Sequence, residues 1–270
     1  MSSETRFEFT RENIDSFLKE LAKEYRKQAG KAMPAELILI GGASILINYG
    51  FRNMTTDIDA LIHASSAMKD AIRLVGDRFS LPSDWLNADF RQTDSYSAKL
   101  PEYSVYYKTW SNTLSVRTIS AEYLVAMKLR SGRQYKSDLS DVIGILAEHE
   151  KKGMPLRLEQ IQKAVSDLYG SWDQLPVSSQ VFIQNVFQEG HFEQLYSQIV
   201  KDENDTRALL IQFEQDYPNI LKQENAGRIT EKLQQKTDRA SLLASLREKQ
   251  REETRQNPRN AKRQPRDDAR

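Results

Sequence analysis

The stretch from Leu37 to Ile62, LILIGGASILINYGFRNMTTDIDALI, most constrains what this chain can fold into. Its first four residues form a short apolar run that ends on Gly41-Gly42, which is typical of a buried strand followed by a sharp turn. The spacing of the apolar residues after this glycine pair predicts a helix that starts near Ala43 or Ser44. The stretch therefore predicts a strand, a glycine turn and a helix in direct succession.

Acidic and apolar residues alternate at the end of this stretch. The run from Asp57 to Ile62 follows a polar link and has the two-residue period of a strand. This period places the carboxylates of Asp57 and Asp59 on one face. Strands disfavour aspartate, and two like charges on one face repel each other unless a cation lies between them. The pair therefore predicts a metal site.

The glycine turn and the acid pair suit one kind of chemistry. Two glycines allow backbone N–H groups to approach a phosphate, and a helix N-terminus behind them adds partial positive charge. Two neighbouring carboxylates suit Mg²⁺ or Mn²⁺, which proteins bind through one or two carboxylates together with substrate phosphates. Phosphoryl and nucleotidyl transfer require both parts. For Gly41-Gly42 alone, a plain strand-to-helix turn is the alternative explanation.

The residues Ile40-Gly41-Gly42 and Asp57-Ile58-Asp59-Ala60 resemble the signature of the nucleotidyltransferase superfamily that includes DNA polymerase β. That signature is an apolar residue, Gly, and Gly or Ser, followed after a short helix by acid, apolar, acid, apolar. The fuller pattern, GGAS with an Arg shortly before TTDID, looks like bacterial minimal nucleotidyltransferases related to the AbiEii-type toxins of abortive-infection and toxin–antitoxin systems. The resemblance covers roughly residues 10 to 150.

The resemblance implies an enzyme that uses Mg²⁺ or Mn²⁺ to move a nucleoside monophosphate from an NTP to a hydroxyl group, with release of pyrophosphate. The acceptor would be RNA, for example a tRNA 3′ end, or a protein side chain. A cognate antitoxin protein would be a further partner. The rival hypothesis is a nucleotidyltransferase-like fold without catalysis, which serves as a nucleotide-binding or protein-interaction module.

The resemblance also implies site residues outside the central stretch. In this family a lysine after LVAMK-like sequence and an acid in the following helix belong to the site, which implies Lys128 with Asp138 or Asp141. Lys128 would stabilise phosphate charge, and one of the two acids would be the general base or orient the acceptor. The alternatives are a lysine that extends its ammonium to solvent and acids that stabilise a first helical turn.

Two further polar residues complete the predicted nucleotide site. Ser44 either contacts a phosphate through its hydroxyl or caps the helix. Arg52 either neutralises a triphosphate or is a solvated loop charge.

The superfamily usually places a third carboxylate on a later strand, where it completes metal binding and accepts the proton of the attacking hydroxyl. The corresponding strand here is expected at residues 113–118, which contain no acid. Either Asp138 or Asp141 takes over that role, or solvent or substrate removes the proton, or catalysis is weak.

The pattern of the whole chain predicts an α+β fold. Residues 1–152 are expected to form a nucleotidyltransferase-type domain, a small mixed β-sheet flanked by helices, with a leading helix from Thr10 to about Gly30 and a hairpin near Trp110. An all-helical C-terminal region is expected at 153–221, with separate helices at 191–201 and 205–221. A solvated helix or linker follows at 222–250, and a disordered tail at 251–270.

Composition excludes several classes of function. The net charge is +1, so no overall attraction to nucleic acid or to anionic membranes is expected. The chain has no cysteine, which excludes disulfides, thiolate nucleophiles and cysteine-based zinc sites. No apolar run approaches the ~20 residues that span a bilayer, and the first residues contain no apolar signal region. We therefore expect a cytoplasmic protein without a membrane partner. Binding of RNA by the basic tail is a third hypothesis, which the interspersed acids disfavour.

Overall fold

The computed structural model describes residues 7–131, 137–222, 225, 227–230 and 232–233. The chain divides into two compact units, Met1–Lys201 and Asp202–Arg270. The first unit contains the sheet and every residue of the predicted site. The predicted tail at 251–270 lies outside the described residues, and so does most of the predicted linker at 222–250.

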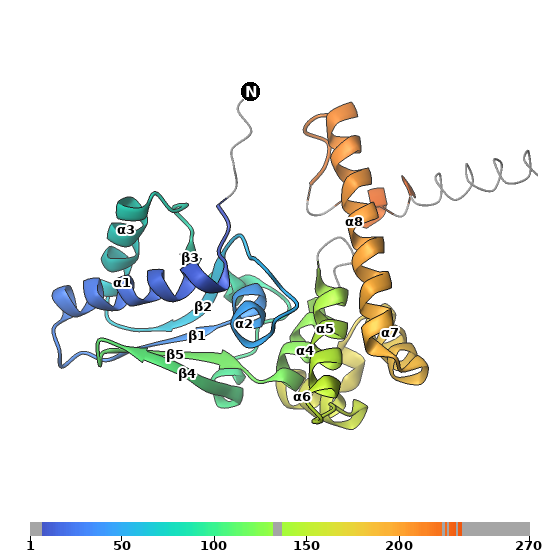
Figure 1. The fold of residues 1–270 in the computed structure, drawn as a ribbon, viewed down its shortest axis with the longest axis horizontal. Coiled ribbons are helices and arrows are strands. Elements are labelled where there is room, and N and C mark those ends of the chain that lie inside the picture. Colours follow the sequence, from blue (N-terminus) through green and yellow to red (C-terminus); the bar gives the residue numbers. More distant parts are fainter. Residues whose placement is uncertain (1–6, 132–136, 223–224, 226, 231, 234–270) are drawn as a thin grey trace, which may run out of the picture. The chain divides into compact units, whose positions relative to one another are not determined.

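Within the described residues, five strands form one mixed sheet in the order β3-β2-β1-β5-β4 (Figure 1). The strands are β1 (Ala35–Leu39), β2 (Ile58–His63), β3 (Leu86–Asn87), β4 (Ser104–Trp110) and β5 (Leu114–Ile119). β1 runs antiparallel to β2 and parallel to β5. β3 runs parallel to β2, and β4 forms the predicted antiparallel hairpin with β5. The predicted α+β class with a small mixed sheet is confirmed.

Helices flank the sheet and follow it in the chain. They are α1 (Arg11–Ala29), α2 (Gly41–Asn48), α3 (Ala67–Phe79), α4 (Ala121–Ser131), α5 (Asp138–Lys151), α6 (Leu158–Tyr169), α7 (Val177–Glu189) and α8 (Phe192–Asp216), with 3₁₀ turns η1 (Asp89–Gln92), η2 (Leu100–Tyr103) and η3 (Trp172–Gln174). The prediction of two helices at 191–201 and 205–221 was wrong. The polar run between them contains neither glycine nor proline, so nothing there interrupts helical hydrogen bonding.

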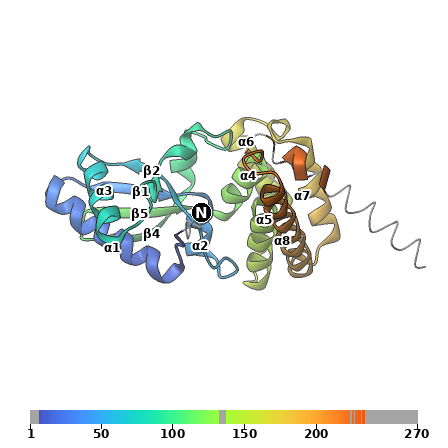
Figure 2. The same cartoon turned by 90° about the horizontal axis from the view of Figure 1, so that it is seen from above.

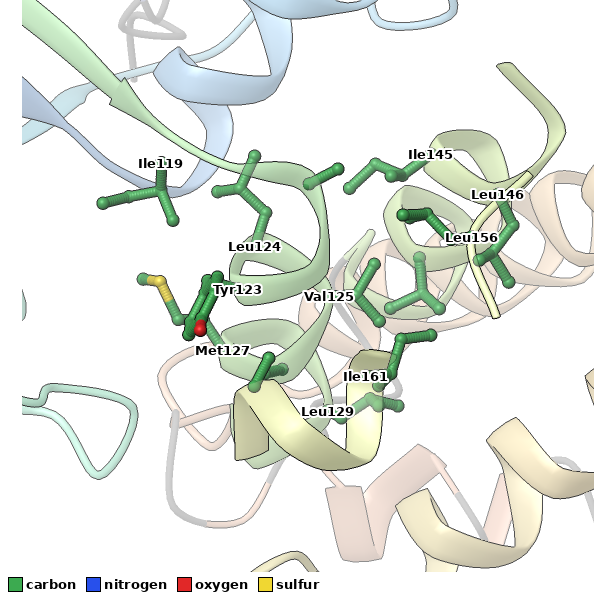
Figure 3. Close-up of a cluster of buried hydrophobic side chains, with 14 of the residues drawn as sticks. Ile119, Tyr123, Leu124, Val125, Met127, Leu129, Ile145, Leu146, Leu156 and Ile161 are labelled. Carbon is green, nitrogen blue, oxygen red and sulfur yellow. The ribbon is translucent and has the colours of Figure 1, made fainter. Parts of the chain in front are cut away.

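The two faces of the sheet belong to different cores. On one face, β1, β2 and β5 contribute side chains to a core with α1 and α3, and Figures 1 and 2 show both helices against the sheet. These side chains are Ala35, Leu37, Leu39, Ile58, Ala60, Leu114 and Val116. On the other face, Ile38, Ile40, Leu61 and Ile119 join a core with α4 to α7. Figure 3 shows the side chains of α4 between Ile119 and those of α5 and α6. The buried side chains of β1, β2 and β5 thus alternate between the two cores.

Candidate functional site

The turn after β1 leads directly into α2. Ile40 is the N-cap and the helix begins at Gly41, two residues earlier than the predicted start at Ala43. Gly41 has a φ of +56°, a left-handed conformation that glycine adopts without strain, so the chain can turn within the first residue of the helix. The first N–H groups of a helix have no intrahelical acceptor and carry partial positive charge. This end of α2 can therefore bind an anion.

The glycine turn is packed closely against the loop that follows α2. A Cβ atom at Gly42 would lie 2.6 Å from Thr55 Oγ1 and 3.1 Å from Arg52 Nη2, so only glycine fits without a shift of these groups. A Cβ atom at Gly41 would lie 3.8 Å from Asp59 Oδ2. The turn therefore brings Arg52 and Asp59 to the same end of α2.

The acid pair lies at the start of β2. The strand begins at Ile58, so Asp57 is exposed just before it rather than inside it as predicted. Ile58 is the first residue held by a neighbouring strand, since its N–H donates to the carbonyl oxygen of Trp85 at 2.9 Å. Asp59 is partly buried, and its carbonyl oxygen accepts a hydrogen bond from the N–H of Ile40 at 2.9 Å. This bond fixes the strand beside the N-terminus of α2.

Ser44 points into the protein. Its side chain is fully buried, and its Oγ accepts a hydrogen bond from the backbone N–H of Ile119 at 3.2 Å. This bond joins α2 to the end of β5 and explains the serine as a structural link. A contact between Ser44 and a phosphate stays a prediction.

Four charged side chains form a partly buried network between the loop after α2 and the helices α4 and α5. Arg52 Nη1 donates to Asp141 Oδ1 and Oδ2 at 2.8 and 2.6 Å. Lys128 Nζ lies 2.7 Å from Asp138 Oδ1 and 2.7 Å from Asp141 Oδ2. The side chains of Asp138 and Asp141 are 1% and 3% exposed, that of Lys128 is 12% exposed, and that of Arg52 is 22% exposed. We call these four residues the ion-pair network.

The ion-pair network determines the charge of Lys128. Burial of the ammonium acts to lower its pKa, and the carboxylates of Asp141 and Asp138 act to raise it. The attraction of the two carboxylates prevails, so the pKa of Lys128 is raised above its ordinary value of 10.5. Lys128 is therefore a permanent cation at neutral pH. Asp141 accepts hydrogen bonds from Arg52 and forms an ion pair with Lys128, an arrangement that suits it to orient both cations.

The raised pKa of Lys128 predicts a specific pH dependence of stability. The stabilisation contributed by its charge is present in full below the ordinary lysine pKa and is lost as the pH rises through the raised value. The difference in free energy of unfolding between the parent and Lys128→Met should therefore be constant from pH 7 to about 10 and should shrink above this range. Urea denaturation at each pH measures this difference. A difference that already falls between pH 7 and 9 would contradict the raised pKa.

Arg52 connects the two halves of the predicted site. Its Nε donates to the carbonyl oxygen of Met54 at 3.1 Å and its Nη1 binds Asp141, while its Nη2 lies beside Gly42. The structure thus places Asp59 beside Gly41 and Arg52 beside Gly42, and it joins Arg52 to Asp141, Lys128 and Asp138 through the ion-pair network. Asp57 lies two residues from Asp59 along the chain, and Ser44 faces the core.

The acids can supply part of a metal site. Among the residues that the structure describes, no three histidine, aspartate or glutamate side chains are placed to hold a metal ion together. Asp57 and Asp59 offer hard carboxylate oxygens, and Mg²⁺ is often bound by one or two carboxylates with its other positions filled by water and substrate phosphates. The donor set therefore fits Mg²⁺ or Mn²⁺ that is bound together with a nucleotide.

The strand expected to carry a third carboxylate does not flank the acid pair. That segment, 113–118, is mostly β5, which pairs with β1, so β1 separates it from β2. On its other side, β2 pairs with the edge strand β3, and Asn87 of β3 is the register partner of Asp59. Asn87 could not be predicted from the sequence, because a strand of two residues has no periodic signal; only the Leu86-Asn87-Ala88 pattern of apolar, polar, apolar residues points to it.

Comparison with known proteins identifies the region that contains this site. No helix among the described residues is long and apolar enough to cross a membrane. No curated protein and no solved structure shows significant similarity to the chain. Residues 16–149 match the family described as nucleotidyltransferase of unknown function (DUF6036). This region, which contains the glycine turn, the acid pair and the ion-pair network, is therefore similar to nucleotidyltransferases, and nucleotidyl transfer is the role that the similarity indicates.

Proposed function

We propose that this protein is a metal-dependent nucleotidyltransferase that moves a nucleoside monophosphate from an NTP to a hydroxyl group. The observation that supports the proposal is the position of Arg52, whose Nη2 lies beside Gly42 and whose Nη1 donates to Asp141. In the proposed site, Arg52 would thus link the N-terminus of α2 with the adjacent Asp59 and with the protonated Lys128. Each of these groups has a role in the transfer of a phosphoryl group.

The glycine turn and the N-terminus of α2 would bind the β- and γ-phosphates through backbone N–H groups. Arg52 would approach the same phosphates through Nη2, the nitrogen beside Gly42, while Nη1 and Nε hold the side chain in place. Lys128 would add a second fixed positive charge. Asp57 and Asp59 would hold Mg²⁺ or Mn²⁺, and this ion would supply neutralisation of phosphate charge and orientation of the reacting oxygens when bound.

The ion-pair network supports a positioning role for Asp138 and Asp141. Both are almost fully buried and form ion pairs with Lys128, and Asp141 also forms an ion pair with Arg52. In this proposal they keep the two cations in place, which limits the reorganisation needed when a triphosphate binds. The proton of the acceptor hydroxyl would then leave to solvent or to the substrate.

The proposed acceptor is a hydroxyl of RNA, such as a tRNA 3′ end, or of a protein side chain. This part of the proposal, together with a cytoplasmic role as the toxin of a toxin–antitoxin or abortive-infection system and a cognate antitoxin, is supported by the resemblance of GGAS and TTDID to AbiEii-type proteins. A non-catalytic nucleotide-binding or interaction module is the second candidate. The amide of Asn87 beside Asp59, in place of a third carboxylate, favours this candidate.

Transfer of label tests the proposal. The purified protein is incubated with each α-³²P-labelled NTP, Mg²⁺ and total bacterial RNA, beside the double variant Asp57→Ala, Asp59→Ala. The parent should label RNA or itself. The double variant lacks both metal ligands, so its rate of transfer should be at least about a hundredfold lower than that of the parent. The double variant Asp70→Ala, Asp77→Ala removes the same charge from the exposed face of α3 and should retain the activity.

Three outcomes decide between the candidates. Undiminished transfer by the Asp57, Asp59 variant would show that these acids are not the metal ligands. Absence of transfer with every NTP, together with Mg²⁺-dependent nucleotide binding in calorimetry, would favour the non-catalytic module. Absence of both transfer and binding would overturn the assignment of residues 41–59 as a nucleotide site.

A further inference from the structure

The register of β2 and β3 places Asn87 beside the acid pair. In this parallel pair Ile58 is the partner of Leu86, and Asp59 is the partner of Asn87. Ile58 and Leu86 both lie in the core with α1 and α3. Side chains alternate between the two faces of a strand, so Asp59 and Asn87 both project from the opposite face. Asn87 is thus the strand neighbour of Asp59 on the face that carries the site.

The position of Asn87 is fixed by Trp85. The indole is 1% exposed, and its Nε1 donates to the carbonyl oxygen of Ile72 in α3 at 3.1 Å. The carbonyl oxygen of Trp85 accepts a hydrogen bond from the backbone N–H of Ile58, at the start of the pairing between β2 and β3. A buried anchor therefore holds this short strand in register against the start of β2.

The amide of Asn87 is oriented by its own loop. Its Nδ2 donates to the carbonyl oxygen of Asp84 at 3.2 Å, and its Oδ1 accepts from the N–H of Asp89 at 2.9 Å. A carbonyl oxygen has two lone pairs, so one accepted hydrogen bond leaves Oδ1 able to act as a neutral oxygen donor. Amide oxygens of this kind are accepted ligands of hard divalent cations.

We propose that Asn87 belongs to the metal site. Its neutral amide keeps the affinity of this site for a metal ion low when no nucleotide is present, so that the ion binds together with the nucleotide. The proposal rests on the proposed function, which makes Asp57 and Asp59 the metal ligands. With Asn87 neutral, these two acids carry the formal negative charge of the site. A third carboxylate at position 87 would attract a divalent cation more strongly and would also repel the phosphates of an NTP. The amide thus makes metal binding depend on the nucleotide.

Calorimetric titration with MnCl₂, first alone and then with a non-hydrolysable ATP analogue, tests this role of Asn87. The variant Asn87→Asp should bind Mn²⁺ without nucleotide at least about tenfold more tightly than the parent, because it adds a negative charge beside Asp59. Aspartate can still accept the hydrogen bond from the N–H of Asp89 but loses the one that Asn87 donates to the carbonyl oxygen of Asp84, so urea denaturation of Asn87→Asp beside the parent measures the cost of this loss. Asn185→Asp, a change of the same charge at an exposed position on α7, should behave as the parent.

A double variant tests whether the gain arises beside Asp59. If the new carboxylate acts together with Asp59, the increase in Mn²⁺ affinity should be lost when Asn87→Asp is combined with Asp59→Ala. A gain that survives the loss of Asp59 would place the new metal site elsewhere and would overturn the proposal. Equal Mn²⁺ affinity of Asn87→Asp and Asn185→Asp would overturn it as well.

The same titrations separate this proposal from the proposed function. Mn²⁺-dependent nucleotide binding by the parent without any gain in Asn87→Asp would refute only the role of Asn87. A gain in Asn87→Asp with no nucleotide binding by the parent would refute the proposed function and would leave Asn87 beside the metal ligands. Tight binding of Mn²⁺ by the parent in the absence of nucleotide would contradict the dependence of the metal on the nucleotide.

Discussion

Replacing Asp141 with alanine is expected to destabilise the protein by about 3–5 kcal/mol, which is the usual cost of removing one partner from a buried ion pair. Asp141 is 3% exposed and neutralises both Arg52 and Lys128. Without it, Lys128 keeps the carboxylate of Asp138 as a partner, and Arg52 loses both hydrogen bonds of Nη1. Urea denaturation at pH 7 measures the change in free energy of unfolding.

Two controls make this prediction specific. Asp77→Ala removes the carboxylate of an exposed ion pair with Arg73, where both side chains are more than 60% exposed, and should leave stability unchanged within error. Asp141→Asn preserves the shape of the side chain and isolates the loss of charge. A destabilisation by Asp141→Ala that is no larger than that by Asp77→Ala would show that the ion-pair network does not stabilise the fold.

The local parts of the site could be predicted from the sequence. Gly41-Gly42 and the alternation from Asp57 to Ile62 are short patterns in which neighbours along the chain are also neighbours in space. These patterns predicted the strand, the turn, the helix and the second strand. The errors were small, a helix that begins at Gly41 and a strand that begins at Ile58. A glycine with positive φ permits the earlier helix start, which the composition alone does not indicate.

The contacts between distant segments could not be predicted in the same way. Arg52 and Asp141 are 89 residues apart, and no pattern along the chain encodes their pairing. The sequence offered two explanations for Asp141, a general base or an acid in a first helical turn, and the structure gives it two cations instead. The pairing of Asn87 with Asp59 likewise could not be predicted, because it depends on a two-residue strand held in place by a buried tryptophan. Sequence thus indicated which residue types matter, while the tertiary fold determines which of them act together.

Replacing Gly42 with alanine is expected to lower the affinity for a metal–nucleotide complex by at least about tenfold and to destabilise the fold by about 1–3 kcal/mol. The new Cβ would lie 2.6 Å from Thr55 Oγ1 and 3.1 Å from Arg52 Nη2, so the loop after α2 must move. This movement displaces Arg52 from the helix N-terminus, where the phosphates would bind. Calorimetry with Mn²⁺ and a non-hydrolysable ATP analogue measures the affinity, and urea denaturation measures the stability.

Gly227 and Thr55 provide the matched tests of this explanation. A Cβ atom at Gly227 meets nothing within 4 Å, so Gly227→Ala makes the same chemical change without a clash and should leave nucleotide affinity at the parent value. Thr55→Ala removes the hydroxyl nearest to the new methyl group and should restore part of the stability and affinity lost in Gly42→Ala. Failure of this rescue, with Arg52 still paired to Asp141, would mean that the methyl group acts on the phosphates themselves. In that case the glycine turn contacts the nucleotide directly, and close packing of the loop is not the reason for glycine at this position.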